Sequence, residues 1–429
     1  MFSQLEFIEK VYPLHRTLVS DDTDKTLDII GEHLPDSLKK GYSIAKIPSG
    51  KKCWTWTAPK KYVVNEAYVE DESGNKILNF NDNYLHLVSY SQPINIVLSY
   101  NELLPHLFYN KKRPGAIPWK FYYYKSDWGF CLPYNDFKKL YKTKKYKVVI
   151  DTEFIDDYLK IGELYIPGEN KSELLITTNV CHPFQVNDSI TGVSAVLEML
   201  HQLNVSTLNK SLRVLFLPET IGSICYFASN LGIEKSIKHG LFAEMLGNNN
   251  SLVLQKSFEG NTYIDQAAEY VMKHELAEYR TAGFREMAGN DELVTNGPWL
   301  NIPTISLTRS HGAFKCYPEY HTSDDNPSML IEDNLTEAAD LMHKIVKLIN
   351  SDFKPVRKFM GPVFLSGYGL WGVWGDLPNG KEYVDKIMYL MEGDLTVFEI
   401  SKKIELDFYT TLRIVNAFWD KGLVERNYE

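Results

Sequence analysis

The sequence predicts an α/β fold in which a mixed, mainly parallel sheet is flanked by helices. Between residues 146 and 348, short apolar segments alternate with longer segments that show helical spacing of apolar residues. Such alternation is typical of a sheet covered by helices on both faces. In addition, polar side chains directly follow several apolar segments, as functional residues do at the carboxyl ends of strands in open α/β sheets.

Two helices are expected before residue 34, because Leu5, Ile8 and Val11, and then Leu27 and Ile30, recur at helical spacing. The segment that begins at Ser20 is the expected cap between these helices. The expected elements of the α/β region are strands at 146–150, 158–161, 163–166, 174–177, 211–217 and 304–307 and helices at 192–203, 263–277 and 334–348.

The 429 residues exceed what one core usually covers, so we expect several domains. The α/β domain should comprise 1–43 and 128–350, interrupted by a β-rich lid at 44–127 that is dense in aromatic residues. A linker rich in Gly, Pro and Trp follows at 351–378, and residues 379–429 resemble a winged helix. We expect the lid's aromatic residues, Trp54, Trp56, Trp119 and Tyr122–Tyr124, to form its small core rather than a ligand platform.

The composition is that of a soluble globular protein, with 44% hydrophobic and 24% charged residues and a net charge of −9. This charge argues against nucleic acid as a partner. The chain begins without a signal-like segment, contains no apolar stretch long enough to span a bilayer, and has five scattered cysteines. We therefore expect a cytoplasmic protein with no membrane contact.

Five polar residues follow apolar segments or turns in a pattern that predicts a metal site: His182, Asp188, Glu219, Glu244 and His321. Two imidazoles and several carboxylates are a donor set that zinc accepts. Asp291 and His311 lie near the later strands and are weaker candidates for lining a substrate pocket, since turn chemistry explains them equally well. Cys181, beside His182, is expected to be an inert buried side chain.

The order of these residues resembles the bacterial zinc aminopeptidases of the leucyl-aminopeptidase and glutamyl-carboxypeptidase-like clan. The family's Asp-Asn-x-Ser-Gly corresponds to residues 188–192, and its Asp-Met-x-Gly corresponds to residues 244–247. The whole chain resembles a bacterial aminopeptidase-like family often associated with polysaccharide biosynthesis, most clearly at 54–59, 181–183, 187–189 and 218–223. The resemblance implies a zinc-exopeptidase-like fold, with His182, Asp188, Glu244 and His321 as metal ligands and Glu219 as general base.

Two departures from the family pattern are visible. The family's His-x-Asp is absent, because Pro183 and Phe184 follow His182, so another acceptor must hold that imidazole. The family's adjacent pair of Glu residues is Glu219 and Thr220 here, which keeps the base and removes one ligand. One zinc ion is therefore expected, held by His182, Asp188 and either Glu244 or His321, although two ions stay an alternative.

The sequence thus predicts a zinc-dependent hydrolase of aminopeptidase type that cleaves an N-terminal peptide or related amide bond. The alternative is a catalytically weak, metal-containing binding or scaffold protein in polysaccharide biosynthesis. The predicted recognition helix, 409–421, carries only Arg413 and Lys421 as cations, with Asp420 beside them. Because phosphate contacts need more positive charge, we expect this region to mediate protein assembly or homo-oligomerisation.

Overall fold

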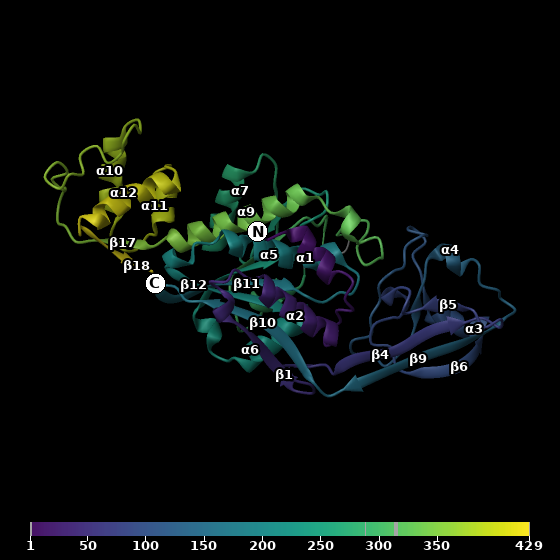
Figure 1. The fold of residues 1–429 in the computed structure, drawn as a ribbon. Coiled ribbons are helices and arrows are strands. Elements are labelled where there is room, and N and C mark those ends of the chain that lie inside the picture. The colour runs from purple at the N-terminus through teal and green to yellow at the C-terminus, as the bar shows by residue number, and fades with distance from the viewer. Residues whose placement is uncertain (1, 288, 313–315, 429) are drawn as a thin grey trace. The chain divides into compact units, whose positions relative to one another are not determined.

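The computed structural model describes residues 2–287, 289–312 and 316–428 and contains two units (Figure 1). The larger unit comprises 1–166, 173–204 and 212–343, and the smaller comprises 167–172, 205–211 and 344–429. Within the described ranges, no helix combines the length and the hydropathy needed to cross a bilayer.

An eight-stranded mixed sheet forms the centre of the larger unit, with the strand order β1-β10-β12-β11-β13-β16-β14-β15. Strands β11, β13 and β16 run parallel to one another, whereas β1, β10 and β12 pair antiparallel at one side. The strands are β1 (Tyr42–Pro48), β10 (Tyr158–Ile166), β11 (Asn170–Asn179), β12 (Lys210–Leu217), β13 (Ile237–Ala243), β14 (Val253–Gln255), β15 (Arg280–Ala282) and β16 (Thr304–Thr308).

Helices α1, α2 and α5 cluster beside strands β10, β11 and β12 (Figure 1). Ser20 caps α2 as expected, since its side chain accepts the Thr23 N–H at 3.2 Å. Helix α5 approaches β13 closely because Gly192 has no side chain: a Cβ there would lie 2.2 Å from the Ala243 carbonyl oxygen. The helices are α1 (Gln4–Val11), α2 (Asp21–His33), α5 (Thr191–Gln202), α6 (Ile221–Ser229), α7 (Tyr263–Glu275), α8 (Asp291–Thr295) and α9 (Glu332–Ser351).

The β-rich region of the larger unit contains a four-stranded antiparallel sheet with the order β5-β4-β9-β6. Its strands are β4 (Lys61–Glu70), β5 (Lys76–Asn79), β6 (Ile94–Ser99) and β9 (Lys145–Ile155), and its shorter elements are β2 (Lys52–Cys53), β3 (Trp56–Thr57), α3 (Tyr100–Leu103), β7 (Leu107–Phe108), β8 (Phe130–Cys131) and α4 (Tyr134–Phe137). The lid was expected to span 44–127, but its sheet also includes β9, which lies after residue 127. Strand β1, which overlaps the expected start of the lid, belongs to the large sheet instead, because it pairs with β10.

The aromatic residues of this region separate into buried and exposed groups. Trp119 is buried, as expected for a core residue, but Trp54, Trp56 and Tyr124 are exposed, so the expectation that they form the core was wrong for these three. The physical reason for Trp54 and Trp56 is local: Trp54 lies in the turn of the short β2–β3 hairpin and Trp56 begins β3, in a two-stranded sheet with no third strand to cover it.

The smaller unit contains three helices and a two-stranded antiparallel sheet. The elements are α10 (Gly380–Leu390), α11 (Val397–Lys403), α12 (Phe408–Asp420), β17 (Lys354–Arg357) and β18 (Val424–Asn427). A capping box begins α11, in which Thr396 and Glu399 bond each other's backbone N–H groups. Residues 351–378 were expected to be a linker, but the segment contains strand β17, which pairs with β18.

Candidate metal centre

The five residues predicted to form a metal site all lie in segments that follow strands of the large sheet. His182 and Asp188 come from the segment between β11 and α5, Glu219 follows β12 by two residues, and Glu244 directly follows β13. His321 lies between β16 and α9. The carboxyl ends of neighbouring parallel strands meet at one edge of a sheet, which is how residues distant in sequence come together.

Two pairs of these side chains are in direct contact. His182 Nε2 lies 3.0 Å from Glu219 Oε2, and His321 Nε2 lies 3.0 Å from Asp188 Oδ2. The potential ligand atoms of His182, Asp188 and His321 all lie within 4.8 Å of one another. The structure therefore brings both imidazoles and the Asp188 carboxylate to one point, with Glu219 at its side.

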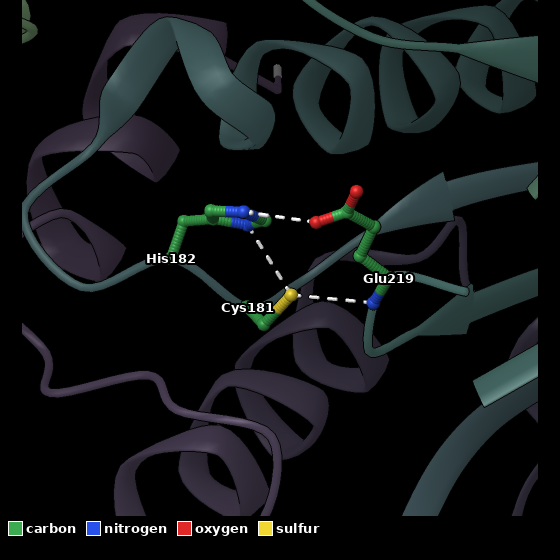
Figure 2. Close-up of side chains that lie close together, drawn as sticks. All are labelled: Cys181, His182 and Glu219. Atoms are coloured by element: carbon green, nitrogen blue, oxygen red, sulfur yellow. Dashed lines mark hydrogen bonds and ion pairs between the residues drawn. The ribbon is translucent and has the colours of Figure 1, made fainter. Parts of the chain in front are cut away.

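Cys181 connects His182 to Glu219 through its sulfur atom (Figure 2). The sulfur lies 3.2 Å from His182 Nδ1 and accepts the backbone N–H of Glu219 at 3.2 Å. In the tautomer that donates Nδ1–H to sulfur, the lone pair of Nε2 is free to bind a cation. Cys181 is buried, as expected, and its sulfur also lies where the absent carboxylate acceptor of His182 would be needed.

Glu244 is fully buried beside this cluster. Its Oε2 accepts a hydrogen bond from Asn290 Nδ2 at 2.6 Å, whereas its Oε1 has no hydrogen-bond partner among the described residues. Burial and the nearby charges of Asp188, Glu292 and Glu219 raise the pKa of Glu244 well above its usual range. Carboxylates that are buried near one another repel unless a proton or a cation lies between them.

The segment that carries His182 and Asp188 is held by two buried charged residues. Asp325 accepts the backbone N–H groups of Val186, Asn187 and Asp188 at 3.2, 2.8 and 3.2 Å. The Arg16 guanidinium donates to the carbonyl oxygens of Val180 and Cys181 at 2.8 and 3.0 Å, and to that of Gln185 at 2.9 Å. Arg16 and the three residues that carry these carbonyl groups are all 0% exposed. Water is therefore not available to replace the guanidinium as a hydrogen-bond donor.

Replacing Arg16 by Met should destabilise the fold by about 2 kcal/mol, because buried carbonyl groups lose their donors. Arg16→Lys should restore only part of this loss, since one ammonium group cannot reproduce the fixed fork of the guanidinium. Urea unfolding of the two variants and the wild type measures the difference. Wild-type stability in Arg16→Met would show that the segment is held without this side chain.

Asp291 and His311, the two candidates for lining a substrate pocket, do not join the cluster. Asp291 is fully buried, where its carboxylate accepts hydrogen bonds from Asn179 Nδ2 at 2.5 Å and from the Ser223 hydroxyl. Burial raises the pKa of Asp291 to about 7. This carboxyl group therefore ties the end of β11 to α6. His311 is exposed, and its backbone N–H donates to the Cys316 carbonyl oxygen at 2.8 Å.

Two aromatic side chains at the site were not predicted from the sequence. Trp119, from the lid, packs its ring edge-on against both His182 and His321, with ring centroids 4.4 and 4.6 Å apart. Tyr320 stacks on His321 at 3.8 Å, and burial together with the charges of Asp188, Cys316, Glu219 and Glu244 raises the pKa of its hydroxyl. The position of Tyr320 next to His321 was a signal in the sequence, whereas nothing there linked Trp119 to the site.

Known proteins resemble this chain over most of its length. A sequence model of the family described as "Domain of unknown function (DUF4910)" matches residues 5–352. The chain belongs to the DUF4910 family. A curated relative from Clostridium acetobutylicum, described as "Putative polysaccharide biosynthesis protein with aminopeptidase-like domain", is 32% identical over 409 residues, which are 94% of this DUF4910 chain and 91% of the relative.

Several solved structures share the fold of this DUF4910 protein. The crystal structure of a "putative peptidase" from Clostridium acetobutylicum is 30% identical and has a TM-score of 0.83, covering 99% of this chain and 96% of that one. A zinc aminopeptidase from Bacillus subtilis is 15% identical with a TM-score of 0.62, covering 80% and 93%. The Peptidase M28 precursor from Shewanella amazonensis is 11% identical with a TM-score of 0.55, covering 80% and 92%. The predicted mixed sheet flanked by helices is confirmed.

Proposed function

We propose that this protein is a zinc-dependent hydrolase of aminopeptidase type that cleaves an N-terminal peptide or related amide bond. The observation that carries the proposal is the convergence of the His182, Asp188 and His321 ligand atoms within 4.8 Å of one another, beside Glu219. Two imidazoles and one carboxylate with an open position are a zinc donor set found in hydrolases. Zinc aminopeptidases also occur among the proteins with this fold.

The residues present fit a divalent cation. Glu244 Oε1 is buried and has no hydrogen-bond partner among the described residues, and the buried Asp188 Oδ2 has only His321 Nε2 beside it, at 3.0 Å. Such orphaned atoms are costly unless something else satisfies them. His182, Asp188 and His321 would hold one zinc ion, and Glu244 lies beside them as a further ligand. Thr220 stands where a second metal would need a carboxylate, which favours one ion over two.

Glu219 is the residue best placed to act as general base. Bound zinc lowers the pKa of a coordinated water molecule to about 7 and polarises a substrate carbonyl group. The Glu219 carboxylate lies beside the donor set and is 29% exposed, so water and substrate can reach it. Glu219 takes a proton from the attacking water and returns it to the leaving amine.

Metal removal tests this proposal. Purified protein should contain about one zinc ion per chain, and a chelator should abolish amide hydrolysis until zinc is restored. A panel of aminoacyl arylamides and acylated amino sugars would identify the substrate class. Two zinc ions per chain would contradict the single-ion site, and zinc-loaded protein that hydrolyses neither class would contradict the proposed activity.

The second candidate function is a metal-containing binding or scaffold protein in polysaccharide biosynthesis, a role suggested by the printed description of the curated relative. The smaller unit supports it, because Met360, Phe364 and Trp371 are exposed there, as at protein interaction sites. Arg413, one of two cations in the segment 409–421, donates to the Val373 carbonyl oxygen at 2.6 Å. We propose that this unit is a winged helix that mediates protein assembly or homo-oligomerisation rather than nucleic acid binding.

A cytoplasmic location is consistent with either candidate function. Cys53, Cys131, Cys181, Cys225 and Cys316 are all free and buried. Unpaired cysteines are typical of proteins in a reducing compartment. We therefore infer that the protein works in the cytoplasm.

A further inference from the structure

The lid segment from Trp119 to Tyr123 carries a row of aromatic rings that starts at the two imidazoles. The Trp119 backbone N–H donates to the His321 carbonyl oxygen at 2.7 Å, which fixes this segment beside the site. The Trp119 ring lies 4.9 Å from Phe121, and Phe121 stacks on Tyr123 at 4.3 Å. Tyr122, between Phe121 and Tyr123 in the sequence, contacts Phe108 of the lid core instead, with ring centroids 6.5 Å apart.

Two properties of this row are unusual for side chains with only a structural role. The Phe121 ring is 42% exposed although it is one ring away from Trp119, which contacts both imidazoles. The Tyr123 hydroxyl is buried and has no hydrogen-bond partner among the described residues. Leaving such a group unsatisfied costs about 1–3 kcal/mol. The folded protein without substrate therefore retains an apolar surface and a hydrogen-bond donor that its own residues do not use.

The Tyr123 hydroxyl also lies within the electrostatic field of the metal site. Burial, and then the charges of Cys181, Tyr90, Glu219 and Asp188, raise the pKa of this phenol well above its usual range. The hydroxyl therefore stays protonated at neutral pH and remains a donor. The Tyr123 ring is linked to the two imidazoles through the rings of Phe121 and Trp119.

We propose that the side chains of Trp119, Phe121 and Tyr123 form the substrate-binding wall of the metal site, with the Tyr123 hydroxyl donating to the amide carbonyl oxygen of the substrate. Phe121 covers an apolar side chain on the acyl group next to that carbonyl. The substrate class is thus an amide whose acyl part is an aminoacyl group with an apolar side chain. This inference rests on the proposed function, because it places the scissile amide at the same cluster.

Binding of leucine hydroxamate to the zinc-loaded, full-length protein tests the inference without requiring turnover. Tyr123→Phe should weaken binding about 10-fold, the value of one neutral hydrogen bond. Tyr122→Phe is the matched control, because it removes a hydroxyl from the neighbouring residue that faces the lid core, and it should bind as the wild type does. Phe121→Ala should reduce the preference for leucine over glycine hydroxamate by about threefold or more.

Zinc content should be the same in all three variants and the wild type. Equal affinity of wild type and Tyr123→Phe, equal weakening by Tyr122→Phe, or no binding to the wild type would each overturn the inference. The protein could bind the hydroxamate in a way that depends on Tyr123 and yet hydrolyse no amide. That result would support this inference and contradict the proposed hydrolase activity. Amide hydrolysis with unchanged hydroxamate binding by Tyr123→Phe would refute this inference alone.

Discussion

Replacing Glu219 by Gln is expected to lower the rate of amide hydrolysis by about 10²–10⁴-fold, the usual contribution of a general base. The amide has nearly the same shape as the carboxylate but cannot take a proton from water. Because the ligand atoms of His182, Asp188 and His321 form a complete group without Glu219, the variant should still bind zinc. The measurement pairs the turnover number with zinc content per chain.

The same experiment distinguishes the base from a metal ligand. Cys181, His182 and Glu219 form a second group whose potential ligand atoms lie within 4.8 Å of one another. If Glu219 were a ligand, Glu219→Gln would lose zinc together with activity. Glu259→Gln, at an exposed carboxylate, is the control and should leave both quantities unchanged. Full turnover by Glu219→Gln would remove this residue from the mechanism.

The residues of the site that follow strands could be predicted from the sequence. His182, Glu219 and Glu244 each come directly or shortly after an apolar strand, and strand ends of a mainly parallel sheet converge. Asp188, at the turn before the helix 192–203, and His321 were part of the same pattern, and the family resemblance placed all five residues in the same order. The boundaries of the central helices were also predictable: α5 and α7 each begin within one residue of the expected positions, since apolar periodicity determines both.

The contribution of the lid could not be predicted in the same way. Whether an aromatic residue such as Trp119 lies in a local core or against a distant imidazole depends on how two parts of the chain pack, and local composition carries no record of that packing. Trp54 and Trp56 lie in the same aromatic-rich part of the sequence as Trp119, but they are exposed whereas Trp119 is buried. Likewise, the sequence showed that His182 lacked its usual acceptor without showing which atom replaces it.

Replacing Cys181 by Ala is expected to weaken zinc binding about 10–100-fold, as removal of a group that orients a ligand imidazole typically does. Two effects combine in this variant. The His182 Nδ1–H loses the sulfur 3.2 Å away, so the ring can rotate, and the Glu219 N–H loses its acceptor at the same distance. Competition between the protein and a zinc chelator measures the affinity.

Conservative replacement separates orientation from simple loss of packing. Cys181→Ser keeps a hydrogen-bond acceptor at the same position, although the shorter C–O bond lengthens both contacts, so its zinc affinity should lie between those of wild type and Cys181→Ala. Cys131→Ala removes another fully buried thiol, one that belongs to the lid core, and should leave zinc affinity unchanged even if stability falls. Equal affinities for wild type and Cys181→Ala would mean that Trp119 and the 180–185 segment orient His182 without the sulfur. A zinc affinity that falls stepwise from wild type through Cys181→Ser to Cys181→Ala would instead show that the sulfur orients His182 as a carboxylate acceptor would.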